Sequence, residues 1–213
     1  MDTLLRRRQM MVMDTAPLPT FHTRLVFDGT AYIDTDIIIP ENGTVRFDGG
    51  YEAEKKSQTL FNVGGKLYGI LNSSTNNTSR FFTANYYGSS AVSGTSLGVA
   101  WTYNTYGFWL TPKRVGIGDR AFTFTKGSTL PEGGLVVGMN AAHTGVAYTG
   151  RLKMIRIYGS DAQNCESTTD LNSYTPVYTL KPCTYNGENG LWCVETDSFY
   201  GNTAGAGQLS VVD

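Results

Sequence analysis

A run of aromatic and asparagine side chains in the middle of the sequence has the chemistry of a carbohydrate-binding surface. Aromatic rings stack on the apolar face of a pyranose, and asparagine amides pair with sugar hydroxyl groups. Strand alternation would place Trp101 and Tyr103 on one face and Asn104 and Tyr106 on the other. The alternative is that these large rings belong to the core. The candidate glycan-binding residues are Trp101, Tyr103, Asn104, Tyr106 and Trp109, together with Asn85 and Tyr87.

Carboxylates arranged for glycoside hydrolysis are not evident in the sequence. A retaining glycosidase places two carboxyl groups about 5 to 5.5 Å apart, one as nucleophile and one as acid. Glu52 and Glu54 would share one face of a strand, but two lysines follow directly, which is typical of a solvated strand end. Glu195 and Asp197 also alternate, but they fall in an expected turn before Phe199-Tyr200, where a structural role is expected. The sequence therefore predicts a protein that is not an enzyme.

The histidines and cysteines form no recognisable catalytic or metal-binding pattern. His22 and His143 are the two histidines, and neither lies near a nucleophile or at metal-ligand spacing in the sequence. His143 is expected in a surface loop. The three cysteines are Cys165, Cys183 and Cys193, an odd number that argues against a disulfide framework. Cys183 and Cys193 flank a predicted hairpin turn, so both a bridge and two buried thiols remain open.

The composition indicates one all-β domain. The 213 residues are long enough for a two-sheet core, and only 16% are charged, while Gly (25), Tyr (13) and Phe (10) are abundant. The net charge of −1 provides no basic field for a polyanion, so nucleic acid is excluded as an expected partner.

Residues 1–20 read as a separate N-terminal arm. Apolar residues fall near helical spacing before Pro17 and Pro19 stop a helix, so a short helix with a stiff linker is one interpretation and a disordered tail is the other. Methionine-rich surfaces commonly pack against partner proteins. The segment shows no secretion signal, and no stretch is long enough to insert into a membrane. The expected partner-docking residues are Leu4, Leu5, Arg6, Arg7, Arg8, Met10, Met11 and Met13.

From residue 24 onward, short apolar runs alternate with turn residues, which is typical of an antiparallel sandwich. Turns are predicted at Gly-containing pairs, including Asp48-Gly49-Gly50 and Asn186-Gly187, and residues 159–174 are predicted as a polar loop. Between residues 151 and 158 the apolar side chains change phase, which predicts a bulge or a strand covered on both faces. The predicted strands are 24–28, 31–38, 44–52, 58–63, 67–72, 79–87, 97–103, 106–110, 113–118, 120–125, 134–139, 147–158, 175–182, 190–195 and 207–212.

The two ends of this region carry motifs of a known domain type. The last third contains Tyr148-Thr-Gly-Arg-Leu-Lys-Met-Ile-Arg-Ile-Tyr158, Leu180-Lys-Pro-Cys183 and Asn202-Thr-Ala-Gly-Ala-Gly207, and the front contains Phe27-Asp-Gly-Thr-Ala-Tyr-Ile-Asp-Thr-Asp36. These segments resemble concanavalin A-like, laminin-G-like domains of the kind found in phage and prophage virion proteins of gut bacteria. The resemblance frames roughly residues 24–210 and is weakest between about 50 and 130.

The resemblance implies an all-β, antiparallel, concanavalin A-like jelly-roll sandwich at residues 21–213, preceded by the arm at 1–20. It also implies a virion surface protein, a fibre or capsid decoration, that adheres to host or mucin glycans, docks on other virion proteins through its arm and forms a homo-oligomer. A stand-alone bacterial carbohydrate-binding protein and a glycoside hydrolase are the alternatives. No cofactor is expected, although related domains often hold Ca²⁺ at a sheet rim. The candidate Ca²⁺ ligands are Asp34, Asp36, Asp119, Asp161 and Asp170.

Overall fold

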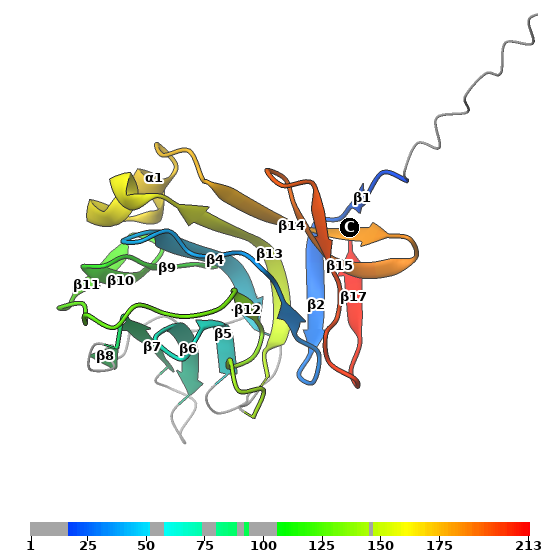
Figure 1. The fold of residues 1–213 in the computed structure, drawn as a ribbon, viewed down its shortest axis with the longest axis horizontal. Coiled ribbons are helices and arrows are strands. Elements are labelled where there is room, and N and C mark those ends of the chain that lie inside the picture. Colours follow the sequence, from blue (N-terminus) through cyan, green and yellow to red (C-terminus); the bar gives the residue numbers. More distant parts are fainter. Residues whose placement is uncertain (1–16, 52–57, 74–79, 89–91, 94–105, 145–146) are drawn as a thin grey trace, which may run out of the picture.

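Two antiparallel sheets face each other across one main core in the computed structural model, which describes residues 17–51, 58–73, 80–88, 92–93, 106–144 and 147–213 (Figure 1). The larger sheet runs in the order β11 (Arg120–Thr123), β10 (Arg114–Ile117), β9 (Tyr106–Leu110), β4 (Thr44–Tyr51), β13 (Thr149–Tyr158), β14 (Tyr178–Tyr185), β15 (Glu188–Cys193) and β16 (Ser198–Tyr200). Three further strands join it: β1 (Thr20–Phe21) pairs with β14, β2 (Arg24–Asp28) with β13, and β17 (Leu209–Val212) with β2.

The smaller sheet lies below it in Figure 1 and carries the site described in the next subsection. Its strands follow the order β3 (Ile33–Asp34), β12 (Val136–Val137), β5 (Gln58–Val63), β6 (Leu67–Ser73), β7 (Arg80–Tyr86) and β8 (Val92–Ser93). The all-β prediction is therefore confirmed. Predicted strands 58–63 and 106–110 have the observed bounds, whereas 31–38 and 134–139 shrink to two residues each. The predicted strand 97–103 lies outside the described residues, and β1, β8 and β16 were not predicted.

The phase change in β13 is a bulge, as the sequence indicated. Pairing between β13 and β4 shifts register between Leu152 and Met154, which leaves Lys153 as the extra, exposed residue. Because of this insertion, Leu152 and Ile155 both face the core although they are three residues apart. The bulge also marks the point where the other neighbour of β13 changes from β2 to β14.

Glycines act as turns at one predicted position and as strand residues at another. Asn186 and Gly187 have φ values of 51° and 81°, so they form the two-residue hairpin between β14 and β15. The turn predicted at residues 48–50 is wrong, because these residues lie within β4. A Cβ on Gly49 would lie 2.6 Å from Cε1 of Phe47 and 3.0 Å from the Arg151 carbonyl oxygen, so the glycine permits close packing inside the sheet.

Aromatic side chains fill the space between the sheets. The Tyr148 ring lies 5.5 Å from Phe27 and 5.5 Å from Phe47, and its hydroxyl donates to the buried carbonyl of Gly50. Tyr86 is also fully buried, and its hydroxyl donates to the Gly43 carbonyl at 2.6 Å. Burial raises the pKa of the Tyr86 hydroxyl well above its usual range. These donations satisfy hydroxyl groups that would otherwise be costly to bury.

The segment predicted as a polar loop at 159–174 contains two short helices that cover the outer face of the larger sheet. They are η1 (Ser160–Asn164) and α1 (Thr168–Leu171), and the Ser167 hydroxyl caps α1 by accepting from the Asp170 backbone N–H at 2.9 Å. The helices bury Trp109, whose indole N–H donates to the Gly118 carbonyl at 2.9 Å. The loop prediction was based on the polarity of this segment, but the residues that cap a short helix are polar as well.

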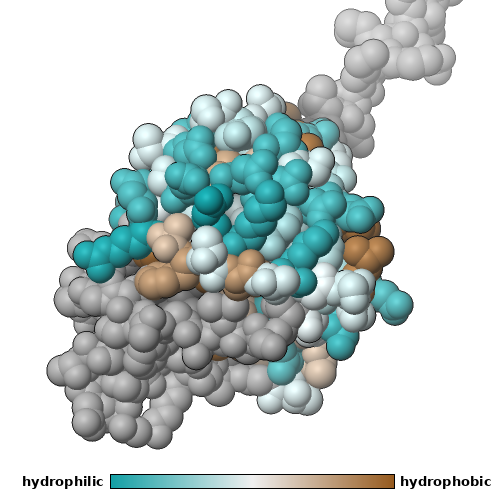
Figure 2. Space-filling model, turned by 90° about the vertical axis from the view of Figure 1, so that its left-hand side faces the viewer, coloured by the Kyte–Doolittle hydropathy of each residue, from teal (hydrophilic) through white to brown (hydrophobic). Residues whose placement is uncertain are grey.

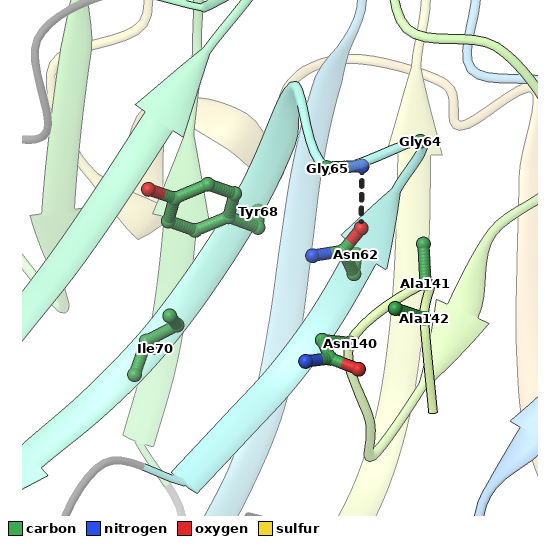
Figure 3. Close-up of a pocket in the computed structure, with 8 residues that line it drawn as sticks. All are labelled: Asn62, Gly64, Gly65, Tyr68, Ile70, Asn140, Ala141 and Ala142. Carbon is green, nitrogen blue, oxygen red and sulfur yellow. Dashed lines mark hydrogen bonds between the residues drawn. The ribbon is translucent and has the colours of Figure 1, made fainter. Parts of the chain in front are cut away.

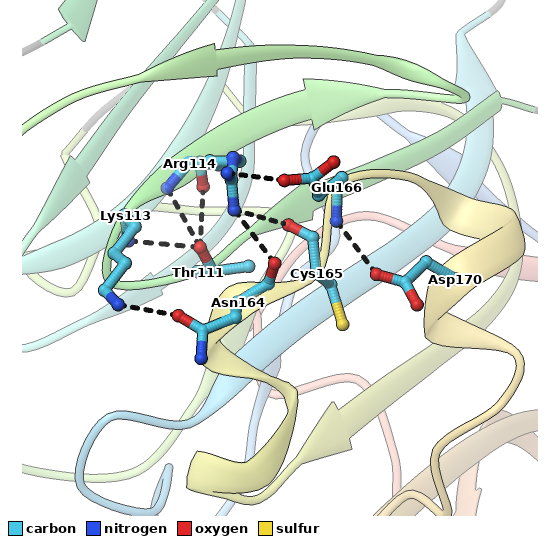
Figure 4. Close-up of polar contacts among 7 residues, drawn as sticks. All are labelled: Thr111, Lys113, Arg114, Asn164, Cys165, Glu166 and Asp170. Atoms are coloured by element: carbon cyan, nitrogen blue, oxygen red, sulfur yellow. Dashed lines mark hydrogen bonds and ion pairs between the residues drawn. The ribbon is translucent and has the colours of Figure 1, made fainter.

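Basic side chains of the β9–β10 hairpin hold this helical segment in place (Figure 4). Arg114 lies 2.7 Å from Glu166 and donates to the Asn164 carbonyl at 2.9 Å, while Lys113 Nζ donates to the Asn164 side chain at 2.6 Å. Seen from the side of α1, β10 and β11, the upper part of the surface is mostly hydrophilic, with a narrower hydrophobic band below it (Figure 2). The cluster of Lys113, Arg114 and Glu166 has a structural role, because its charged groups contact other residues of the chain.

The three cysteines are buried free thiols. Across the β14–β15 hairpin, Cys183 is opposite Gly190 and Cys193 is opposite Leu180, so the two cysteines are not cross-strand partners. Burial raises the pKa of both Cys165 and Cys183 to about 11. The interpretation as buried thiols is therefore confirmed, and the alternative of a bridge is wrong.

At the N-terminal end, β1 straddles the predicted boundary between residues 20 and 21 and pairs with β14. Leu18, just before β1, and Phe21, within it, are exposed. Residues 1–16, with all the expected partner-docking side chains and the predicted helix, lie outside the described residues. Among the residues that are described, no helix has the length and apolar character to cross a membrane.

Candidate functional site

A row of polar side chains crosses three neighbouring strands on the outer face of the smaller sheet. Tyr68 on β6 pairs with Asn62 on β5 and with Asn85 on β7, and direct cross-strand partners project from the same face of a sheet. The neighbours of Tyr68 along β6 alternate, so Leu67 lies in the core while Tyr68 and Ile70 remain partly exposed. The sheet thus presents one aromatic ring between two carboxamides.

Both asparagines are held by the same local turn. The Asn62 side-chain oxygen accepts the Gly65 backbone N–H at 2.9 Å, and the Asn85 oxygen accepts the Gly88 N–H at 2.8 Å. Because a backbone N–H requires an acceptor, these bonds fix which end of each amide is oxygen. In Figure 3 the Asn62 nitrogen points away from the turn, toward the side of the groove on which Tyr68 lies.

A groove of about 530 Å³ opens over Asn62, Tyr68 and Ile70. Its opposite wall is the loop that follows β12, with Ala141 and Ala142 facing β6 across the opening (Figure 3). This volume lies within the range of small-ligand pockets. Apolar walls with a few polar groups at the floor are the usual arrangement of such a pocket.

The loop that closes the groove is shaped by its own hydrogen bonds. The Asn140 side-chain oxygen accepts the Thr144 backbone N–H at 2.9 Å, and its carbonyl accepts the His143 N–H at 3.0 Å. The Asn140 amide nitrogen consequently faces the groove on the same side as that of Asn62 (Figure 3). His143 adopts a positive φ of 55° to complete the turn.

A second hollow of about 280 Å³ adjoins the groove, since Gly64 and Ala141 line both. Here the His143 ring stacks on Tyr32 with 4.4 Å between centroids, and its Nε2 lies 3.0 Å from Asp34 Oδ1. The prediction that His143 is in a surface loop is confirmed. The ring and the carboxylate hold the loop against β3, and they extend the polar surface available to a longer ligand.

The predicted glycan-binding residues do not form one platform. Trp101, Tyr103 and Asn104 lie outside the described residues, and only the backbone of Tyr106 is described, in β9. Trp109 is fully buried beneath the helical segment, so its assignment as a stacking ring is corrected to a core residue.

The structure supports only one of the two remaining predicted glycan-binding residues, Tyr87 and Asn85, as part of the polar row. Tyr87 is 2% exposed, and its hydroxyl accepts the Asn42 backbone N–H at 2.9 Å, so it too belongs to the core. Asn85 is largely buried but stands in the row beside Tyr68. Sequence reasoning missed Asn62, Tyr68 and Asn140. The repeated Asn-x-x-Gly pattern at 62–65 and 85–88 is the signal that could have located the row.

The candidate Ca²⁺ ligands are spread over separate parts of the surface. Asp34 pairs with His143, Asp36 accepts from the Tyr200 hydroxyl, and Asp119 accepts from Thr168 and Thr169 at 3.3 Å each. Asp161 lies in η1 and Asp170 in α1. Within the part of the chain that the structure describes, no three His, Cys, Asp or Glu side chains are grouped to hold a metal ion.

The acids considered for hydrolysis are not gathered at the groove. Glu52 and Glu54 are outside the described residues. Glu195 Oε2 accepts the Thr179 backbone N–H at 2.5 Å, at the end of the β14–β15 pair in the larger sheet. Glu195 therefore has a structural partner and is remote from the groove on the smaller sheet.

Comparison with known proteins places the fold. No protein-family model matches the chain, and no curated protein gives a significant match. Solved structures do match, among them the crystal structure of a native heptameric SAP-like pentraxin from Limulus polyphemus, with a TM-score of 0.58 and 12% sequence identity over 92% of this chain and 98% of the pentraxin chain. A likeness at this identity concerns the fold alone, and it confirms the predicted jelly-roll β-sandwich.

Proposed function

We propose that this protein is a non-enzymatic, lectin-like adhesin that binds glycans in the groove over β5 and β6. The observation that carries the proposal is the position of Tyr68 beside the turn-fixed Asn62 at the floor of an open groove of about 530 Å³, with Asn140 on the loop opposite. A fold of this class hosts many functions, so the proposal rests on the site rather than on the fold.

The groove supplies the contacts that a sugar ring requires. The partly exposed Tyr68 ring offers an apolar face for the C–H groups of a pyranose, and its hydroxyl offers a polar handle at the edge. The Asn62 and Asn140 amides are oriented before a ligand arrives, because backbone N–H groups already occupy their oxygens. Preorganised groups lose little conformational entropy on binding, which favours affinity.

An array of immobilised glycans tests this proposal with three forms of the protein. We expect the wild type to bind a defined subset of glycans and Tyr68→Ala to lose that binding. Tyr185→Ala is the matched control, because Tyr185 is a partly exposed tyrosine in a separate aromatic cluster, 5.2 Å from Trp192 and 5.5 Å from Phe199. Binding that survives Tyr68→Ala but is lost in Tyr185→Ala would move the site to that cluster and refute the groove.

The proposed setting of this adhesin is the surface of a virion, as a fibre or capsid decoration anchored by residues 1–20. The support is the family resemblance and the apolar, arginine-containing sequence of the arm, which continues into the exposed Leu18 and Phe21 beside β1. Mass spectrometry of purified virions should detect the protein. Its absence from virions would favour the stand-alone bacterial carbohydrate-binding protein instead.

The absence of enzymatic activity is part of the proposal and has its own test. Incubation with β-glucans, mucin and capsule polysaccharides should release no reducing sugar. Turnover that Glu195→Gln abolishes would establish the glycoside hydrolase alternative.

A further inference from the structure

The two asparagines that line the groove present the same chemical group to it. Asn62 and Asn140 each use the side-chain oxygen to accept a backbone N–H, from Gly65 at 2.9 Å and from Thr144 at 2.9 Å. Each amide therefore presents its NH₂ group to the groove, and Figure 3 shows both nitrogens on the same side, toward β6. An NH₂ group donates and does not accept. The groove thus offers one NH₂ donor from its floor, at Asn62, and one from its loop wall, at Asn140.

The remaining lining of the groove is mostly apolar. Ala141 and Ala142 on the loop face Ile70 on β6 across the opening, and all three line the groove with the two asparagines (Figure 3). A sugar hydroxyl is both donor and acceptor, whereas the two NH₂ groups only donate, so they suit a ligand atom that only accepts. A ligand group that has an acceptor and no donor, followed by a small apolar end, matches this lining better.

An acetyl group has this combination, because its carbonyl oxygen accepts two hydrogen bonds and its methyl group is apolar. We propose that the groove recognises acetylated sugars, with the acetyl carbonyl accepting from the Asn62 and Asn140 amides and the methyl group packed against Ala141, Ala142 and Ile70. Tyr68 then stacks on the sugar ring that bears the acetyl group. This inference rests on the proposed glycan-binding function and adds its ligand class.

Matched pairs of sugars test the ligand class by titration. The probes are N-acetylglucosamine and N-acetylgalactosamine oligosaccharides, their unacetylated amino-sugar and parent-sugar counterparts, and an O-acetylated oligosaccharide before and after mild alkali. We expect acetylated members to bind about tenfold or more tightly than their counterparts, as two lost hydrogen bonds and a lost methyl contact require. The N-acetyl and O-acetyl arms identify which source of the acetyl group the protein prefers.

Two substitutions test the contact itself. Asn62→Asp keeps an oxygen for the Gly65 N–H and replaces the NH₂ donor with an acceptor, so it should weaken binding of the acetylated probe about tenfold or more. Asn85→Asp makes the same change in the same type of turn, at a residue that does not line the groove, and should bind as the wild type does. Equal losses in both variants would overturn the assignment of the carbonyl to Asn62.

The outcomes separate this inference from the function on which it rests. Equal affinity for acetylated and unacetylated members of each pair, with loss of both in Tyr68→Ala, would overturn the acetyl specificity and leave the glycan site standing. Binding to none of these probes and to no glycan on the array would overturn both.

Discussion

Protonation of Asp28 should lower the free energy of unfolding, because the Asp28 carboxylate links β2 to the segment that leads into β17. Asp28 is the last residue of β2, and its Oδ1 accepts from Thr30 N at 2.8 Å, Thr30 Oγ1 at 2.8 Å and Ala31 N at 2.9 Å. Its Oδ2 accepts from Gln208 N at 2.7 Å, in the segment that leads into β17. Partial burial alone would raise the pKa, but the hydrogen bonds from Gln208, Ala31 and Thr30 outweigh it and lower the pKa from 3.8 to about 2.

The sign of the effect follows from this lowered pKa. A carboxyl group whose pKa is lower in the folded state stabilises the fold above its unfolded pKa of 3.8, and that contribution disappears as the pH falls toward about 2. The difference between the two pKa values corresponds to an upper bound of about 2.5 kcal/mol. Because Asp28 is exposed, solvent screening reduces the expected contribution to about 1 kcal/mol.

Urea unfolding between pH 5 and pH 2 measures this contribution as the difference between the wild type and Asp28→Asn. We expect the wild type to be more stable at pH 5, and this advantage to shrink by about 1 kcal/mol at pH 2. An advantage over Asp28→Asn that is the same at both pH values would refute the reasoning.

Three further expectations follow from the packing. Gly134→Ala should destabilise the fold by more than about 2 kcal/mol in thermal unfolding, because its Cβ would lie 1.8 Å from the Thr35 carbonyl oxygen, whereas Gly205→Ala, with no atom within 4 Å, should change stability little. Cys165 should resist iodoacetamide at pH 8 until urea is added, because burial raises its pKa to about 11; rapid alkylation of the folded protein would contradict its burial. Deleting residues 1–16 should shift the melting temperature by less than about 3 °C and reduce the mass measured by light scattering; an unchanged oligomer would argue against docking through the arm.

The sheet architecture was largely predictable because local signals agreed with it. Alternation in strands such as 24–28 and the Asn186-Gly187 hairpin turn depend on neighbouring residues alone. The bulge at Lys153 was also visible, as a change of phase in the apolar pattern. The glycines at 49 and 50 were misread because a turn and a tightly packed strand use the same residue for different reasons.

The candidate site was less accessible to sequence reasoning, because its residues meet only through long-range pairing. Asn62 and Asn140 are separated by most of the middle of the chain and line one groove after β5 pairs with β12. The aromatic run ending at Trp109 attracted attention by its composition, yet Trp109 is covered by helices in a segment whose polarity predicted a loop. The composition pointed to aromatic and asparagine side chains as sugar-binding groups. Only the pairing of the strands shows which of these side chains lie over β5 and β6.

A crystal structure of the protein with its strongest glycan from the array tests the central claim most directly. The account predicts that the sugar ring lies on Tyr68, between β6 and the loop that carries Ala141, with an acetyl oxygen within hydrogen-bond distance of the Asn62 amide nitrogen. A glycan seated instead on the cluster of Tyr185, Trp192 and Phe199, with the groove empty, would contradict the account.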